Sequence, residues 1–279
     1  MDDETGLPKD RNSYGTHLMG GNHSRIEAPY IQYNQENGYY YLFTSFGGLD
    51  ADGGYNLRVA RSKNPDGPYE DSQGNPMAEV KGKFGTVFDD ASIQDFGTKI
   101  MGNFLYTENT SNEGVGYVSP GHNSTYYDEE TNQYYLIFHT RFPNSGEYHS
   151  VRVHQMFFTE AGWPVVSPLR YSEETIADYT KNQVTGAYTL ISFDKFLTDD
   201  LKEPQEITVE KNGTIKGDRT GTWELAEKNS QEDSSVVIDD TVYKGKFLSG
   251  WDENQQKQVM TFTGTSEAGV PLFIVRNEE

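Results

Sequence analysis

Two side chains of the 279-residue chain, Glu27 and His122, have a setting in which they could do chemistry. Glu27 belongs to the segment GGNHSRIEAPY (residues 20–30), and His122 belongs to VSPGHNS (residues 118–124). A carboxylic acid in a cleft can act as a general acid when its pKa is raised. A histidine can bind a metal ion or another ligand. These two residues are therefore the first candidates for a functional site.

Each candidate also has a simpler interpretation. Arg25 and Glu27 share one face of a strand, because side chains alternate along it, and an Arg–Glu pair at a strand start is common. Arg25 would favour the ionised form of Glu27, so another carboxylate would have to offset it. A lone histidine such as His122 is more often a hydrogen-bonded structural residue. The remaining histidines have no metal-binding spacing such as HExxH.

An acidic segment, Asp50 to Gly54, begins like a calcium loop. It lacks the later carboxylates of such a loop. We interpret it as a turn that could line a cleft.

An internal repeat indicates which elements position the candidates. Aromatic runs occur at 39–43 (YYYLF) and 134–138 (YYLIF), each after a turn segment and each followed by an Arg-Val strand at 57–61 or 151–154. Tyr39 and Phe43 lie 95 residues before Tyr134 and Phe138, while Arg58 and Arg152 differ by 94. Aromatic and β-branched residues favour strands. The pattern predicts two similar antiparallel units.

A repeated unit of roughly four strands is typical of a β-propeller blade. The long spacing would leave residues 77–114 as an inserted connection. On the 95-residue offset Glu27 lies opposite His122, and both would face the propeller axis. The alternative is two unrelated hairpins in a sandwich.

The C-terminal part alternates short β-rich runs with turns and has no helical period. Seven strands are predicted there, at 187–193, 206–209, 221–225, 236–238, 242–248, 258–263 and 272–275. The fold class is therefore all-β, a partial propeller of about two blades followed by a small β-barrel or sandwich. We place the propeller part at residues 1–168, a linker at 169–182 and the accessory domain at 183–279.

Composition excludes several classes of function. With no cysteine the chain has no disulfide framework and no thiol nucleophile. A net charge of −20 argues against nucleic acid or an anionic membrane as partner. No window approaches 18 consecutive apolar residues. An acidic chain with 19 Tyr suits a secreted protein that handles neutral polar ligands such as sugars.

Five segments resemble the endo-arabinanases of glycoside hydrolase family 43. They are GGNHSRIEAPY (20–30), YYLFTSFGGL (40–49), YNLRVARS (55–62), SPGHNS (119–124) and VRVHQMF (151–157). The tail resembles the C-terminal accessory domain of that family. The resemblance implies a five-bladed propeller that hydrolyses α-1,5-linked L-arabinan with inversion. It also implies that Glu27 is the general acid and that His122 holds a calcium ion near the axis.

The chain departs from the family in one respect. An inverting reaction also needs a carboxylate base, about 6.5–9.5 Å from the acid. The family has this aspartate, and a second one that tunes the acid, far upstream of the glutamate. No position here matches either. The N-terminal residues MDDETGLP (1–8) resemble an internal turn between blades. We therefore expect only the C-terminal part of an enzyme, inactive or nearly so without an N-terminal propeller fragment.

Three alternatives stay open. The chain could come from an exo-acting arabinofuranosidase or β-xylosidase of the same family, from a non-catalytic carbohydrate-binding remnant, or from a decayed gene. Secretion of the full-length enzyme is implied by the family and the composition, because any signal peptide would lie on the missing part.

Overall fold

The computed structural model describes the chain except for residues 1, 3, 11, 108–113, 175, 229, 231 and 278–279. Its strands are β1 (Ile26–Asn34), β2 (Tyr39–Phe46), β3 (Asn56–Ser62), β4 (Thr98–Met101), β5 (Phe104–Leu105), β6 (Gly116–Asp128), β7 (Gln133–Arg141), β8 (His149–Phe158), β9 (Pro164–Val166), β10 (Gly186–Ser192), β11 (Gln205–Val209), β12 (Thr214–Gly217), β13 (Gly221–Glu224), β14 (Ser234–Ile238), β15 (Thr241–Asp252), β16 (Lys257–Ser266) and β17 (Pro271–Asn277). Short helices are η1 (Met77–Glu79), η2 (Asp90–Ser92) and α1 (Lys181–Val184).

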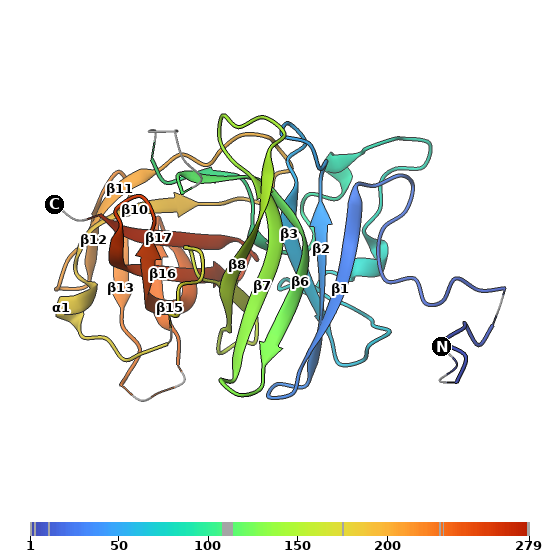
Figure 1. Ribbon diagram of the computed structural model, residues 1–279, viewed down its shortest axis with the longest axis horizontal. Helices are drawn as coiled ribbons and strands as arrows, with labels where there is room; N and C mark the ends of the chain where they lie inside the picture. Colours follow the sequence, from blue (N-terminus) through green and yellow to red (C-terminus); the bar gives the residue numbers. More distant parts are fainter. Residues whose placement is uncertain are drawn as a thin grey trace.

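The strands form three sheets, so the predicted all-β class is confirmed. The first sheet has the order β1-β2-β3-β4 and the second β5-β6-β7-β8-β9, while β10 to β17 close into an eight-stranded barrel. The two open sheets lie side by side, and the barrel covers one end of the pair (Figure 1). Of the two forms predicted for the tail, the barrel is therefore correct. None of the described helices is long and apolar enough to span a membrane.

The first two sheets repeat each other with an offset of 94 residues. Tyr33 pairs with Tyr40 in the first sheet, and Tyr127 pairs with Tyr134 in the second. All seven pairs between β2 and β3 recur between β7 and β8 at the same offset. The repeat is thus confirmed, but the predicted 95-residue offset is wrong by one. The 94-residue spacing of Arg58 and Arg152 gives the true register.

The corrected register changes the relation between the two candidates. Glu27 pairs with Ser45, and the equivalent pair in the second sheet is Gly121 with His139. Glu27 therefore corresponds to Gly121, while His122 corresponds to Ala28. Both strands carry a register shift at this point, and Ala28 and His122 both adopt left-handed backbone, with φ of 53° and 50°. Non-glycine residues adopt this conformation uncommonly, so the two sheets share a strained bulge.

The two open sheets pack on each other through opposite faces of the repeated unit. Phe43 and Leu57 of the first sheet are fully buried in the core shared with the second sheet. Their equivalents at the 94-residue offset are Ile137 and Val151, which do not belong to that core, and Val151 is 63% exposed. Each sheet therefore has one face built to contact a neighbour. In the second sheet that face is partly exposed.

Two details of the predicted layout need correction. Residues 77–114 are not only a connection, because they contain β4 and β5, which extend the first and second sheets. The barrel also has an eighth strand, Thr214–Gly217, that the sequence did not predict. The interval 169–182, predicted as a linker, lies between β9 and β10, and helix α1 begins at its end.

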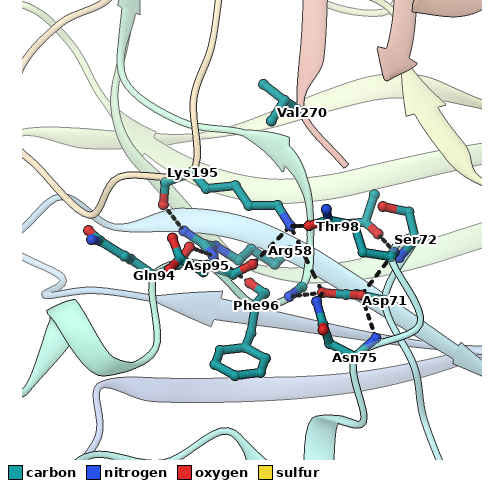
Figure 2. Close-up of polar contacts among 12 residues, drawn as sticks. Arg58, Asp71, Ser72, Asn75, Gln94, Asp95, Phe96, Thr98, Lys195 and Val270 are labelled. Carbon is teal, nitrogen blue, oxygen red and sulfur yellow. Dashed lines mark hydrogen bonds and ion pairs between the residues drawn. The ribbon is translucent and has the colours of Figure 1, made fainter. Parts of the chain in front are cut away.

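Buried cations join the first sheet to the barrel (Figure 2). Arg58 of β3 is fully buried and donates hydrogen bonds to the carbonyls of Gln94, Phe96 and Lys195. Lys195 belongs to the segment between barrel strands β10 and β11. Burial lowers the pKa of Arg58 to about 9, which is still above neutral pH, so the guanidinium stays charged.

Two more lysines complete this junction. Lys99 of β4 is buried and donates to the carbonyls of Asp194 and Phe196. Lys195 Nζ donates to Gln73 and to the carbonyl of Asp95, and it lies 3.9 Å from the buried carboxylate of Asp71. Buried polar groups are stable only when they are hydrogen-bonded. The barrel segment 194–196 therefore depends on basic side chains of both domains.

Replacing Arg58 by methionine tests this junction. Arg58→Met leaves three carbonyl oxygens without the donor they have now, and each such loss costs about 1–3 kcal/mol. We expect the free energy of unfolding, measured with urea, to fall by about 3 kcal/mol or more. Lys216→Met is the control, because its side chain is 65% exposed and surface pairs contribute about 1 kcal/mol at most. Equal stability of the two variants would contradict the assignment.

A buried histidine makes stability depend on pH. His154 Nδ1 lies 2.7 Å from the carbonyl of Ser167 and Nε2 lies 2.8 Å from the Tyr117 hydroxyl. A carbonyl only accepts, so the neutral ring carries its proton on Nδ1. Burial lowers the pKa of His154 to about 4. The unfolded chain therefore binds the proton first, and stability that is present above about pH 6.5 is lost as the pH falls toward 4.

The variant His154→Gln removes this titration. From pH 7 to pH 5 the wild-type chain should lose about 2 kcal/mol more unfolding free energy than the variant. Urea unfolding at several pH values measures the difference. A stability gap that does not change with pH would refute the buried neutral imidazole.

Candidate active site

Glu27 lies at the start of β1, on the edge of the first sheet, and its side chain is exposed. The Tyr55 hydroxyl donates a hydrogen bond of 2.6 Å to Glu27 Oε1. Burial, together with this bond, raises the pKa of Tyr55 well above its usual range, so the phenol keeps its proton and remains the donor. Among the described residues none is bonded to Glu27 Oε2. That second oxygen is therefore available to a molecule from outside.

Tyr55 is held in place by both sheets. Its side chain is fully buried, and its ring packs against Gly121 of β6, where a Cβ atom would lie 2.0 Å from the ring. Ser45 Oγ accepts a 2.8 Å hydrogen bond from the His122 backbone N–H, and the Ser45 hydroxyl also interacts with Tyr55. The glycine at the bulge thus makes room for the tyrosine that orients Glu27.

Three histidines form a cluster beside Tyr55. The His139 ring stacks on Tyr55 at 6.1 Å between centroids, and it lies 6.0 Å from His122 and 5.5 Å from His149. Burial lowers the pKa of His139 to about 4, assisted by His149, Arg141 and His122 and opposed by the charge of Glu27. His139 is therefore neutral at neutral pH. The structure brings both predicted residues, Glu27 and His122, into one neighbourhood around His139.

Unsatisfied polar atoms gather in the same strands. Asn123 is buried, and neither its Nδ2 nor its Oδ1 has a hydrogen-bond partner. The Nδ1 of His139 and the Nη1 of Arg141 are also buried without a partner. Buried polar groups are nearly always hydrogen-bonded. These atoms lie on β6 and β7, the strands that also carry His122 and His139.

The predicted alternative of an Arg25–Glu27 pair is not what the chain forms. Arg25 makes a two-pronged ion pair with Asp90 of η2, with Nε 3.1 Å from Asp90 Oδ1. Asp90 is thus the carboxylate that neutralises Arg25, as the sequence reasoning required, and Glu27 is left to Tyr55.

The acidic segment Asp50 to Gly54 forms a turn, as predicted. Gly53 N–H donates to the Asp50 carbonyl, and that carbonyl also accepts from Ser119 Oγ of β6 at 2.8 Å. Ala51 N–H donates to Glu147, which is paired with Arg141. The turn therefore bridges the two sheets beside the site.

The calcium ion that the resemblance implies at His122 stays a prediction. Calcium takes 6–8 oxygen ligands, whereas the rings near His122 offer nitrogen. No group of three or more His, Asp or Glu side chains in the described part of the chain could hold a metal ion. We therefore derive no step through a metal.

Tyr55, Ser45 and His139 were not singled out from the sequence. Tyr55 and Ser45 stand in two of the segments that resemble family 43, which was the one available signal. Their roles depend on contacts between sheets. The bond between His122 and Ser45, for example, joins residues 77 positions apart.

These features define the class of protein. It is an all-β protein with two equivalent open sheets and a closed barrel, and a glutamate lies at the edge of the first sheet. The matches to protein-family models divide the chain near the end of β9, where the second sheet ends. Residues 7–164 match the model of the glycosyl hydrolases family 43, and residues 168–274 match that of a C-terminal lipocalin-like domain. The chain belongs to glycosyl hydrolase family 43, as the sequence resemblance predicted.

Similar proteins are known from bacteria. The chain is 53% identical over 274 residues to the extracellular endo-α-(1→5)-L-arabinanase 2 of Bacillus subtilis, covering 98% of this chain and 57% of that protein. A family 43 protein of Bacillus licheniformis, YxiA, superposes with a TM-score of 0.94 at 49% identity, covering 100% and 62%. The endo-1,5-α-L-arabinanase of Thermotoga petrophila gives 0.92 at 44% identity, covering 100% and 61%. The chain thus spans less than two thirds of these relatives.

The packing of Gly121 against Tyr55 can be tested by adding one methyl group. Gly121→Ala would place its Cβ about 2 Å from the buried ring, and overpacking costs about 1–3 kcal/mol. We expect urea unfolding to show a loss of about 2 kcal/mol or more. Gly250→Ala is the matched control in the barrel, where the nearest heavy atom would lie 3.4 Å away. If both variants were equally stable, Gly121 would not position Tyr55.

Proposed function

We propose that the chain is the acid-bearing portion of a secreted, endo-acting α-1,5-L-arabinanase. The observation that carries this proposal is the state of the Glu27 carboxyl. Its Oε1 accepts a hydrogen bond from Tyr55, and no described residue is bonded to its Oε2. A general acid needs such an oriented, accessible oxygen within hydrogen-bond reach of its target. The named activity and extracellular location of the Bacillus subtilis and Thermotoga petrophila relatives support the substrate and the secretion.

In the proposed reaction Glu27 gives its proton to the departing glycosidic oxygen. Tyr55 keeps the carboxyl in place and cannot itself take the proton, because its own phenol stays protonated. Inversion requires a carboxylate base on the other side of the sugar. Asp50 and Asp52 belong to the turn that joins the sheets, while Asp90 and Glu147 are paired with Arg25 and Arg141. Among the described residues no carboxylate bonds to the Glu27 carboxyl.

The base is therefore proposed to come from further sheets of a propeller. The 94-residue register supports this. Ile137 and Val151 of the second sheet correspond to Phe43 and Leu57 of the first sheet, which are fully buried in the core shared with the second sheet. Tyr126 on β6 of the same sheet is 56% exposed. The unbonded atoms of Asn123 and His139 lie in the same strands, β6 and β7. Calcium at His122 stays a prediction, and no step above depends on it.

The test supplies the missing part. The portion of the Bacillus subtilis relative that this chain does not match is fused to the chain, and hydrolysis of linear α-1,5-arabinan is measured. We expect release of oligosaccharides, and a loss of about 10²–10⁴-fold in kcat on Glu27→Gln, as for removal of a general acid. The loss should be smaller on an aryl arabinofuranoside with a good leaving group, which needs less protonation.

Glu36→Gln is the matched control, because Glu36 lies in the turn at the other end of β1. The chain alone should release almost no product. Glu27-dependent hydrolysis by the chain alone would contradict the need for further sheets. Full activity of the Glu27→Gln fusion would contradict the assignment of the acid. Release of single arabinose or xylose units would favour the exo-acting alternative, and binding without hydrolysis would favour the carbohydrate-binding remnant.

A further inference from the structure

A cleft lies between the sheets and the barrel. It has a volume of about 980 Å³, and one wall comes from residues 72–73 and 159–163 while the other comes from the barrel turns at 240–244 and 265–268. Ligand pockets usually span about 300–1,000 Å³. The cleft is therefore large enough for a ligand of several rings.

The cleft is distant from Glu27. Next to the cleft wall, the Gly162 carbonyl accepts a hydrogen bond from the hydroxyl of Tyr41, near the beginning of β2. Glu27 pairs with Ser45, near the end of the same strand. Four residues along a strand amount to about 13 Å. A ligand in this cleft would thus not occupy the candidate active site.

The lining combines apolar and polar groups in a pattern suited to a sugar chain. Trp163, which is 7% exposed, and the half-exposed side chain of Val242 give apolar contact. Thr241, Lys244, Asp240 and Glu267 add a hydroxyl, an ammonium and two carboxylates, and all four residues are exposed. None of these three charged side chains has an ion-pair partner in the described structure.

The apolar wall is rigid before any ligand arrives. Arg61 lies over the Trp163 ring at 4.2 Å and over Tyr39 at 4.4 Å, and it donates to the Ala161 carbonyl. The backbone of Trp163 is bonded twice to Thr159. A preorganised site loses less entropy on binding.

We propose that this cleft binds a segment of α-1,5-linked L-arabinan away from the catalytic residues. Each 1,5-linked arabinose unit has two neighbouring free hydroxyls, and both can donate hydrogen bonds to one carboxylate. The C–H surface of the same unit would pack on Trp163 and Val242. The two carboxylates exclude an anionic polymer. The choice of arabinan rests on the proposed function, while the site itself rests on the cleft.

The experiment is calorimetric titration of the whole 279-residue chain with α-1,5-L-arabinohexaose. We expect saturable binding that is weakened about tenfold or more by Glu267→Gln combined with Asp240→Asn, and similarly by Val242→Asp. The matched controls, Glu224→Gln on the barrel and Val151→Asp on the second sheet, should bind like the wild-type chain. All replaced residues are exposed, so the variants should fold.

Absence of binding overturns the proposal, and so does binding that is lost with Glu27→Gln but survives the cleft variants. Its failure can be told apart from failure of the proposed function. If the fused enzyme cleaves arabinan while this chain binds nothing, only the second site is wrong. If the chain binds through the cleft while the fused enzyme does not cleave, only the proposed activity is wrong.

Discussion

Basic side chains buried between the first sheet and the barrel hold this structure together. Arg58 and Lys99 reach from β3 and β4 to carbonyls of residues 194–196, and Lys195 reaches back toward Asp71. Cations removed from water are stable only when each N–H finds an acceptor, so the barrel segment can adopt few other positions. Arg58 also organises its own sheet, because it binds the carbonyls of Gln94 and Phe96 just before β4. The same cations therefore fix the start of β4 and the barrel segment 194–196 relative to the first sheet.

The sheets in turn create the candidate site through their repeat. At equivalent bulges the first sheet carries Glu27 and the second carries Gly121. The smaller residue admits the Tyr55 ring, and the larger one receives its hydrogen bond. A duplicated unit has thus become asymmetric at one pair of positions. The same repeat gives the second sheet a contact face that is partly exposed, and this is the physical ground for expecting further sheets.

Some of this was predictable and some was not. The aromatic hairpins and seven of the eight barrel strands follow from alternation and β propensity, whereas Thr214–Gly217 is too short and polar to be recognised. The strings YYYLF and YYLIF align almost equally well at offsets of 94 and 95, so only hydrogen-bond pairing could decide. Arg58 lies in a strand recognised from its sequence, yet a buried arginine runs against the usual exposure of charge. The role of Tyr55 depends on a glycine 66 residues away.

The central claim is that the second sheet has an exposed face, around Ile137 and Val151, that is built to contact a further sheet. The most direct measurement is sedimentation of this chain mixed with the separately expressed portion of the Bacillus subtilis relative that it does not match. The account predicts a one-to-one complex, weakened by Val151→Asp on the exposed face and unaffected by Glu224→Gln on the barrel. Two species that sediment independently at high concentration, with this chain monomeric and fully folded, would contradict it.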